Sequence, residues 1–502
     1  MWADFATHFA AGLVMLFQPD CLLACLVGMV VGIIFGVLPG IGASSGLAIL
    51  FPFTFGMSTQ ASILLLLSAY TGCEYGGSIT SITINIPGNA AAAVTCLDGY
   101  PLAKKGFARK ALMISLWSGF VAGILSTIAF IVLATPLAWF ALRFGPPEMF
   151  AVSLFGLSII SSLTGKSTLK GLIAVSIGLF IGVVGTDPFS GFGRFAFERP
   201  YLMDGIPLAV GFVGIFAIPE VIRMLEEAGF GETGKAESVQ GKGLSFAEFK
   251  RLFPSMLRGS IIGTFVGIIP GLGTAIASFI AYNEEKRWSK RPADFGTGVE
   301  EGVASPEASN NAVVCACLIP SLALGIPGSA SAAMFVGLLI LKGIVPGPLM
   351  FEKSGPLIML IFAGLILINF YMLAVSYLGL RISTAIAEVP AKLLGPFVFI
   401  LCLTGVYAYG GSFYHVLCAF LIGVFCWLLE KIEIPVIPIA LGMVMQNLIE
   451  ENLIGSLMIH QGDFSVFFTR PISAVVITIA VFVLILGFWR ERTHAGRGEA
   501  RV

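Results

Sequence analysis

Hydrophobic positions along this chain form runs of about 20 residues that recur from one end to the other. Residues 111–134, 357–380 and 472–489 are three such runs, each with few polar interruptions. A run of this length crosses a bilayer as one α-helix, and the recurrence predicts roughly a dozen membrane segments. The hydrophobic pattern therefore predicts an all-α polytopic membrane protein.

Composition narrows the class further. Of the 502 residues, 57% are hydrophobic and only 12% are charged, which is too few to cover a soluble surface. The net charge is zero, so nothing indicates a nucleic-acid partner. The nine cysteines and four histidines lack the spacing of a zinc site or a disulfide framework. We therefore expect no cofactor, and we interpret the cysteines as buried, reduced side chains.

Glycines and prolines interrupt the hydrophobic runs in a pattern that occurs twice. Around PGIG at 39–42, each glycine and proline recurs 231 positions later, around PGLG at 270–273 (270 − 39 = 231). A second pair, NIPGNAAAAV at 85–94 and GIPGSASAAM at 325–334, matches at an offset of 240 (325 − 85 = 240). The sequence therefore predicts two related halves. The matched positions of the first pair are Gly28 and Gly259, Gly32 and Gly263, Gly36 and Gly267, Pro39 and Pro270, Gly40 and Gly271, and Gly42 and Gly273.

These matches define the expected organisation of the chain. The halves are placed at 21–225 and 255–490, and the larger second offset fits an insertion in the second half. A polar, charged cytoplasmic linker is expected at 226–254 and a polar tail at 491–502. Residues 1–20 carry apolar side chains at helical spacing, which fits a helix lying in the membrane interface and equally an ordinary packed helix.

Basic residues orient the two halves. Residues 51–60, after the first PG motif, contain no Lys or Arg, whereas the corresponding residues 282–291 contain four. After the second motif the relation reverses, because residues 100–110 are more basic than 341–355. Since basic loops stay in the cytoplasm, the halves are predicted to be inverted-topology repeats.

The PG motifs are predicted to be tips of re-entrant hairpins or breaks in helices that bind a substrate. Irregular backbone at membrane depth is tolerated where it lines a cavity, and helix N-termini there favour anions. Close helix packing is the alternative reading of any single motif. The candidate substrate-binding residues are Pro39, Gly40, Gly42, Ser44, Ser45, Asn85, Pro87, Gly88, Asn89, Pro270, Gly271, Gly273, Thr274, Pro327, Gly328 and Ser329.

Polar residues near the motifs are candidates for ion coupling through their oxygen atoms. Glu74 and Glu307 stand in largely apolar stretches, where a carboxylate is expensive and usually functional, although Glu74 fits a wetted loop equally well. Asn310 and Asn311 fit a helix start or a place beside the substrate. The candidate ion-coupling residues are Glu74, Thr83, Ser278, Asn310 and Asn311.

Several long motifs give the chain a specific resemblance to a known family. They include GVLPGIG at 36–42, residues 75–106 from YGGSITSI to PLAKKG, SPEASNNA at 305–312, FGPPEMFA at 144–151 and FFTRPIS at 467–473. With these motifs the chain resembles the large membrane subunit, TctA-type, of the tripartite tricarboxylate transporters.

The resemblance implies a transporter of the bacterial inner membrane with an elevator-like fold. It implies uptake of citrate-like tricarboxylates or dicarboxylates, driven by an ion gradient that is usually taken to be sodium. It also implies two partners, a small four-helix membrane subunit (TctB-type) and a periplasmic solute-binding protein (TctC-type). The alternatives are a channel and an intramembrane enzyme, for which we find no catalytic constellation, and the sequence leaves open whether the protein forms a homodimer.

Overall fold

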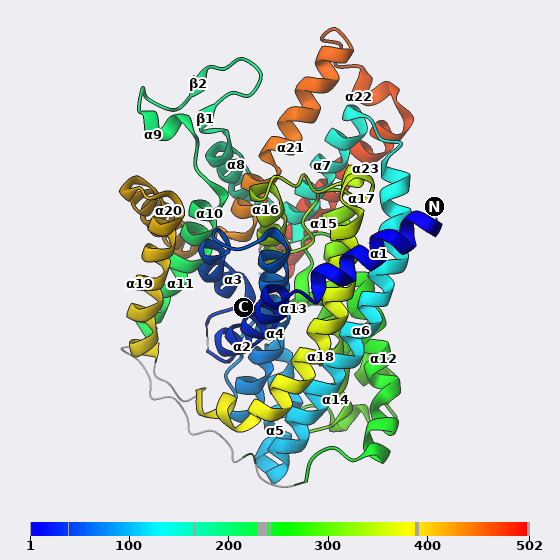
Figure 1. The fold of residues 1–502 in the computed structure, drawn as a ribbon. Helices are drawn as coiled ribbons and strands as arrows, with labels where there is room; N and C mark the ends of the chain where they lie inside the picture. The colour runs from blue at the N-terminus through cyan, green and yellow to red at the C-terminus, as the bar shows by residue number, and fades with distance from the viewer. Residues whose placement is uncertain are drawn as a thin grey trace.

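The computed structural model describes residues 2–38, 40–163, 167–227, 239, 242–386 and 391–498. These residues form an elongated bundle of helices with one short antiparallel β-ribbon at one end (Figure 1). Six of the described helical segments are long and apolar enough to cross a membrane, and further apolar helices are shorter. The prediction of an all-α polytopic membrane protein is therefore confirmed. The six segments are Pro19–Val37, Ala92–Ala141, Leu208–Glu226, Gly355–Leu380, Phe413–Lys431 and Pro471–Trp489.

The first part of the chain supplies the elements up to residue 227. They are α1 (Trp2–Leu16), α2 (Pro19–Val37), α3 (Ala43–Leu50), η1 (Phe51–Thr54), α4 (Thr59–Thr83), α5 (Ala92–Leu102), η2 (Ala103–Phe107), α6 (Ala108–Ala141), α7 (Pro146–Leu163), α8 (Thr168–Val183), β1 (Gly185–Thr186), β2 (Gly193–Arg194), α9 (Pro200–Met203), α10 (Leu208–Phe212), η3 (Val213–Ala217) and α11 (Ile218–Glu227).

The second part of the chain begins its helices at Phe246. They are α12 (Phe246–Ile268), α13 (Gly273–Trp288), η4 (Pro292–Asp294), α14 (Glu301–Ala316), α15 (Leu318–Ala323), α16 (Ala330–Leu341), α17 (Pro348–Lys353), α18 (Gly355–Ile386), α19 (Ala391–Gly410), α20 (Phe413–Lys431), α21 (Ile437–Ile459), α22 (Val466–Thr469) and α23 (Pro471–Gly498).

The glycine row of α2 is a packing surface for α4. A Cβ atom added at Gly28, Gly32 or Gly36 would lie less than 3.0 Å from a backbone oxygen of α4. The helices therefore touch through their backbones, as small residues permit in membranes. The oxygens that meet these glycines belong in order to Leu65, Ala69 and Cys73, so the contacts advance in the same direction along both helices. Consequently α2 and α4 run parallel, and the chain between them returns through α3 and η1.

The same arrangement joins α12 and α14. The positions of Gly259 and Gly263 leave no room for a Cβ atom beside the backbone oxygens of Ser305 and Ser309. These contacts also advance together, so α12 and α14 run parallel and α13 returns between them. The PG breaks therefore lie at the turns between α2 and α3 and between α12 and α13, where the chain reverses its direction.

Helices near the chain midpoint pack on helices near its end. A Cβ at Gly178 of α8 would collide with the Ile439 oxygen of α21, and one at Gly442 of α21 would come within 3.0 Å of the Val175 oxygen of α8. A Cβ at Gly214, in η3, would likewise press on the Ala419 oxygen of α20. Both parts of the chain therefore contribute to one interleaved structure.

Helices α12 and α23 extend across the expected domain limits. Helix α12 starts inside the expected linker, because Ser245 and Glu248 form a capping box that begins it. Residues 228–238 and 240–241 of that linker lie outside the described residues. Helix α23 continues to Gly498, into the expected polar tail. Helix α1 packs on α18, where Gly12 lies against Met359 and Leu360.

Helix α5 and the neighbouring ends of α12 and α14 lie together at one end of the bundle (Figure 1). The chain at this end is rich in lysine and arginine, at 104–110 and 250–251. There Lys110 pairs with Glu248 and with Glu300, and Arg251 also pairs with Glu300. The bonds from Lys110 and then Ser245 lower the pKa of Glu248 to about 2. The opposite end carries α9, the β-ribbon and α22 (Figure 1).

Candidate functional site

The first hairpin tip lies between α2 and α3. Gly40 adopts a φ of 91°, a left-handed conformation that favours glycine, and it lies beside the Glu220 carboxyl group. Gly42 precedes α3, and a Cβ atom added there would meet nothing within 4 Å. Ser44, in the first turn of α3, is half-buried. Pro39 lies outside the described residues. This tip combines a tight turn with open space beside a helix N-terminus.

The second tip, between α12 and α13, has the same kind of turn. Gly271 and Gly273 have φ values of 84° and 66°. The Gly271 N–H donates to the Gly328 oxygen at 3.0 Å, which ties the tip directly to the second PG motif of the same half. Pro270 is buried and Thr274 is half-buried. The structure therefore brings the two predicted motifs of this half together.

The motifs NIPG and GIPG form the same turn with different residues. Asn85 has a φ of 58° and Gly325 a φ of 75°. In the first motif the N–H groups of Ile84 and Ile86 both donate to the Thr80 oxygen. The N–H groups of Leu324 and Ile326 donate to the Pro320 oxygen in the same way. Asparagine is one of the few residues other than glycine that tolerate this left-handed conformation. This explains why Asn85 stands in the first motif where Gly325 stands in the second.

The next helices start from matched caps. The Asn89 side-chain oxygen accepts from the Ala92 N–H at 2.8 Å, and the Ser329 hydroxyl accepts from the Ala332 N–H at 3.1 Å. Gly88 is pressed against the Gly36 oxygen of α2, so the first motif also touches the helix that leads to its hairpin tip. The two motifs differ in access, because Asn85 and Pro87 are exposed whereas Pro327 and Gly328 are buried.

One turn of α4 joins the motifs of both halves. The Tyr70 hydroxyl lies 3.3 Å from the Ser329 hydroxyl of the second half. Four residues further on, the Glu74 carboxylate accepts from the Asn89 amide at 3.1 Å. The Asn310 amide donates to the Glu74 backbone oxygen at 3.2 Å. Glu74, Asn89, Asn310 and Ser329, all predicted from sequence, therefore gather around α4.

Three predicted hydroxyls are directed to nearby backbone instead. Ser45 donates to the Phe216 oxygen of η3 at 3.3 Å. Thr83 donates to Ile79 within its own helix, and Ser278 donates to Pro306 at 3.3 Å. Substrate binding by Ser45 and ion coupling by Thr83 and Ser278 stay predictions.

Asp98 is a buried carboxylate that the sequence reasoning did not single out. It is 0% exposed within α5 and accepts hydrogen bonds from the backbone N–H groups of Gly296, Gly298 and Val299. The Tyr282 hydroxyl of α13 donates to it at 2.8 Å. Asp98 thus fastens α5 of the first half to the loop that leads into α14. An acidic residue within the apolar context of α5 was the available signal.

The atoms in this interior that could bind a metal ion are hydroxyl, amide and carboxylate oxygens. Within the described ranges, no three His, Cys, Asp or Glu side chains come together as a metal-binding group. Oxygen donors of this kind suit hard cations.

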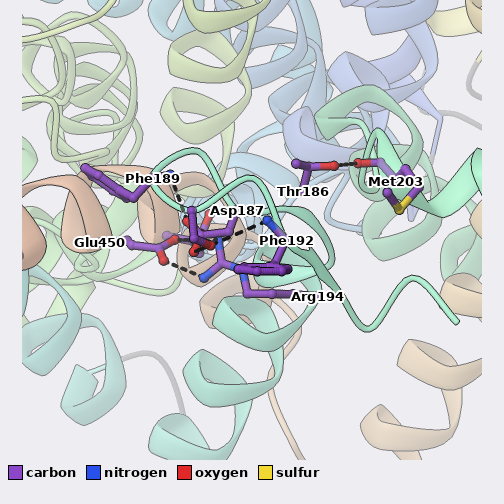
Figure 2. Close-up of polar contacts among 9 residues, drawn as sticks. Thr186, Asp187, Phe189, Phe192, Arg194, Met203 and Glu450 are labelled. Atoms are coloured by element: carbon purple, nitrogen blue, oxygen red, sulfur yellow. Dashed lines mark hydrogen bonds and ion pairs between the residues drawn. The ribbon is translucent and has the colours of Figure 1, made fainter. Parts of the chain in front are cut away.

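A second ordered feature lies at the end of the bundle opposite the basic one, where β1 and β2 carry a phenylalanine-rich loop (Figure 2). Arg194 donates to both carboxylate oxygens of Glu450 on α21, at 2.5 and 3.2 Å. Asp187 accepts from the Ser190 hydroxyl and the Phe189 N–H, and these bonds, together with Arg194, hold its pKa below the ordinary value. The loop is therefore fixed in place although Phe192 is 77% exposed.

We expect Arg194→Ala to increase cleavage of this loop by chymotrypsin about fivefold, since about 1 kcal/mol of local stability is lost with the Glu450 bonds. Cleavage rates of the purified protein measure the effect. Arg199→Ala, an exposed change close by, is the matched control and leaves the rate unchanged. Equal rates for the two variants would show that the Glu450 contact does not hold the loop. Ionised Asp187 also stabilises the folded loop. This stabilisation is present at neutral pH and is lost as the pH falls through the lowered pKa of Asp187.

Fold and site together define a multi-pass α-helical membrane protein with paired backbone breaks around a polar interior. The chain matches the family model described as "Tripartite tricarboxylate transporter TctA family" over residues 22–441, and it belongs to this family. The resemblance read from the motifs is thus confirmed.

Two curated relatives come from Agrobacterium vitis. An "Uncharacterized 52.8 kDa protein in TAR-I ttuC' 3'region" is 36% identical over 447 residues, which covers 89% of each chain. An "Uncharacterized protein in TAR-II ttuC' 3'region" is 34% identical over 224 residues, 45% of this chain and 93% of the relative. No solved structure matches the chain.

Proposed function

We propose that this protein is the large membrane subunit of a secondary carrier that imports organic tricarboxylates or dicarboxylates such as citrate. The single observation that carries the proposal is the convergence of both halves' motifs on α4, where Tyr70 contacts Ser329 and Glu74 contacts Asn89. Transporters bind substrate at such paired helix breaks near the middle of the membrane. Membership of a tricarboxylate transporter family supports the substrate class.

The helix seams support a repeat. In the first half Gly28 meets residue 65, a separation of 37 (65 − 28), and in the second half Gly259 meets residue 305, a separation of 46 (305 − 259). The difference of nine equals the change in motif offset from 231 to 240 (46 − 37 = 240 − 231). A single nine-residue insertion between 274 and 305 would account for both differences. With the reversed distribution of basic residues, this supports inverted repeats and an elevator-like mechanism.

The motifs suit a carboxylate without a buried Lys or Arg. Helices α3, α5, α13 and α16 start beside the breaks, so their N–H groups and dipoles favour an anion there. Half-buried Ser44, Asn89, Thr274 and Ser329 would add hydroxyl and amide donors. Open space at Gly42 and the exposure of Asn85 support access to such a site.

The remaining parts of the proposal concern coupling and assembly. Sodium is the proposed coupling ion, and oxygen donors around Glu74 and Asn310 support a hard cation. The basic end of the bundle is placed in the cytoplasm, and the location is the inner membrane of a bacterium. The proposed partners are the small four-helix subunit and a periplasmic solute-binding protein, consistent with a tripartite system.

Uptake in proteoliposomes tests the function. Both membrane subunits are reconstituted, and labelled citrate and related acids are offered with binding protein, with and without a sodium gradient. We expect accumulation against the substrate gradient only when the ion gradient is present. No ion-dependent accumulation of any carboxylate would contradict the proposal, and dissipation of a preset gradient would indicate the channel alternative.

Asn85→Gly tests the substrate site with the backbone preserved. Gly325 adopts the same left-handed turn, so glycine keeps the fold at 85 while the amide is removed. We expect uptake to fall at least tenfold with unchanged thermal stability. Ser44→Trp, which fills the first tip, is expected to have the same effect. Ser176→Ala on the outer face of α8 is the control, and uptake at the wild-type rate by both site variants would show that the site lies elsewhere.

A further inference from the structure

A carboxylate surrounded by hydroxyl groups lies within the helices. Glu307 of α14 is 1% exposed. Ser78 of α4 donates to both of its oxygens at 2.7 Å, and Ser115 of α6 donates at 2.7 Å. Thr95 of α5 makes a further short bond to the carboxylate. Four helices therefore converge on one acidic group through oxygen atoms.

No positive side chain among the described residues balances this carboxylate. Among the ion pairs of the described residues, none involves Glu307 or the neighbouring Glu74, which is 5% exposed. A buried, unpaired carboxylate is strongly unfavourable, and in membranes such a group marks an ion pathway. The Glu307 environment therefore favours a bound cation.

Unpartnered oxygen atoms one turn away point to the same conclusion. The Asn311 amide donates to the Glu307 backbone oxygen at 3.2 Å, but its own side-chain oxygen has no hydrogen-bond partner and the residue is 2% exposed. Asn311 lies against Gly119, four residues along α6 from Ser115. The Ser118 hydroxyl is also fully buried and without a partner. A buried acceptor without a donor destabilises the fold, and a bound cation would offset that cost.

We propose that Glu307, Ser78, Thr95, Ser115 and the Asn311 side-chain oxygen bind one dehydrated Na⁺. One carboxylate among neutral oxygens balances a single positive charge, whereas Ca²⁺ sites use several carboxylates and transition-metal sites use nitrogen or sulfur. The site deepens the proposed function, and it rests on that function only for its role in coupling. The hydroxyls come from α4, α5 and α6 and the carboxylate from α14, so ion binding would lock parts of both halves together.

Sodium-dependent thermal stability tests the site without any carboxylate substrate. The purified full chain is titrated with NaCl against choline chloride at constant ionic strength. We expect a saturable rise of the melting temperature with Na⁺ in the wild type, because a ligand that binds only the folded state stabilises it. Glu307→Gln is expected to abolish the rise, and Ser115→Ala to increase the half-saturating Na⁺ concentration at least about tenfold.

Ser126→Ala is the matched control for Ser115→Ala, since it removes another fully buried hydroxyl of α6, one that donates to the Ala312 backbone oxygen, and it is expected to keep the Na⁺-dependent rise unchanged. A rise of wild-type size in Glu307→Gln, or none in the wild type, would overturn the site. Should Glu307→Gln fail to fold, an unchanged half-saturating concentration in Ser115→Ala would overturn it equally. Loss of carboxylate uptake with an intact Na⁺ response would count against the proposed function and leave the ion site standing.

Discussion

Asp98→Ala is expected to destabilise the protein by about 3–5 kcal/mol, one of the largest effects of any single change in the described structure. The substitution removes the acceptor of three backbone N–H groups, at Gly296, Gly298 and Val299, and of the Tyr282 hydroxyl. These donors are then left without partners where water does not replace the carboxylate. The loop before α14 would detach from α5, and we expect both the melting temperature and carboxylate uptake to fall.

Asp294→Ala is the control for this change, because Asp294 lies in the same loop but its side chain is 50% exposed and, among the described residues, pairs only with Arg291. Its melting temperature should equal that of the wild type. Asp98→Asn keeps one acceptor oxygen and should give an intermediate loss. If the melting temperature of Asp98→Ala equals that of the wild type, the loop is held by other contacts.

Gly32→Leu is expected to have a comparable effect through packing, at about 3 kcal/mol or more. Its Cβ would already fall less than 3.0 Å from the backbone of Ala69, and a rigid helix backbone cannot yield as a side chain does. Helices α2 and α4 would have to separate, which disturbs the hairpin at Gly40 and the contact of Gly88 with Gly36. The thermal unfolding of the purified protein, monitored by size-exclusion chromatography after heating, measures the loss of stability.

Gly42→Leu separates packing from function in the same segment. Nothing lies within 4 Å of the Cβ position at Gly42, so this variant should fold with wild-type stability. Since Gly42 stands at the proposed substrate site, uptake should nevertheless decrease. Equal melting temperatures for the two leucine variants would refute the packing role assigned to Gly32.

Local patterns made much of this structure predictable. Apolar runs gave the helices, and the spacing of Gly28, Gly32 and Gly36 gave a side-chain-free face before its partner was known. The PG motifs predicted backbone breaks, and the left-handed Gly40 and Gly271 stand where the sequence placed them. These features depend on residues close together in sequence, which explains their predictability.

Contacts between distant segments were not predictable in this way. Asp98 meets residues almost 200 positions later, and the hydroxyls around Glu307 come from three other helices. Each of these serines and threonines is unremarkable in its own helix. Arg194 and Glu450 are likewise 256 residues apart. Without an account of which helices are neighbours, no periodicity or spacing singles these residues out.

The packing of α8 against α21 also affects the order in which the chain can fold during synthesis. Gly178 and Ile439 are 261 residues apart (439 − 178 = 261), so at about 5–20 residues per second the ribosome needs roughly 13–50 s to supply the second helix after the first. Throughout that interval the glycine face of α8 lacks its partner helix. The nascent protein therefore passes through a long-lived, half-assembled stage in the membrane, and cellular quality control has that whole interval to recognise it.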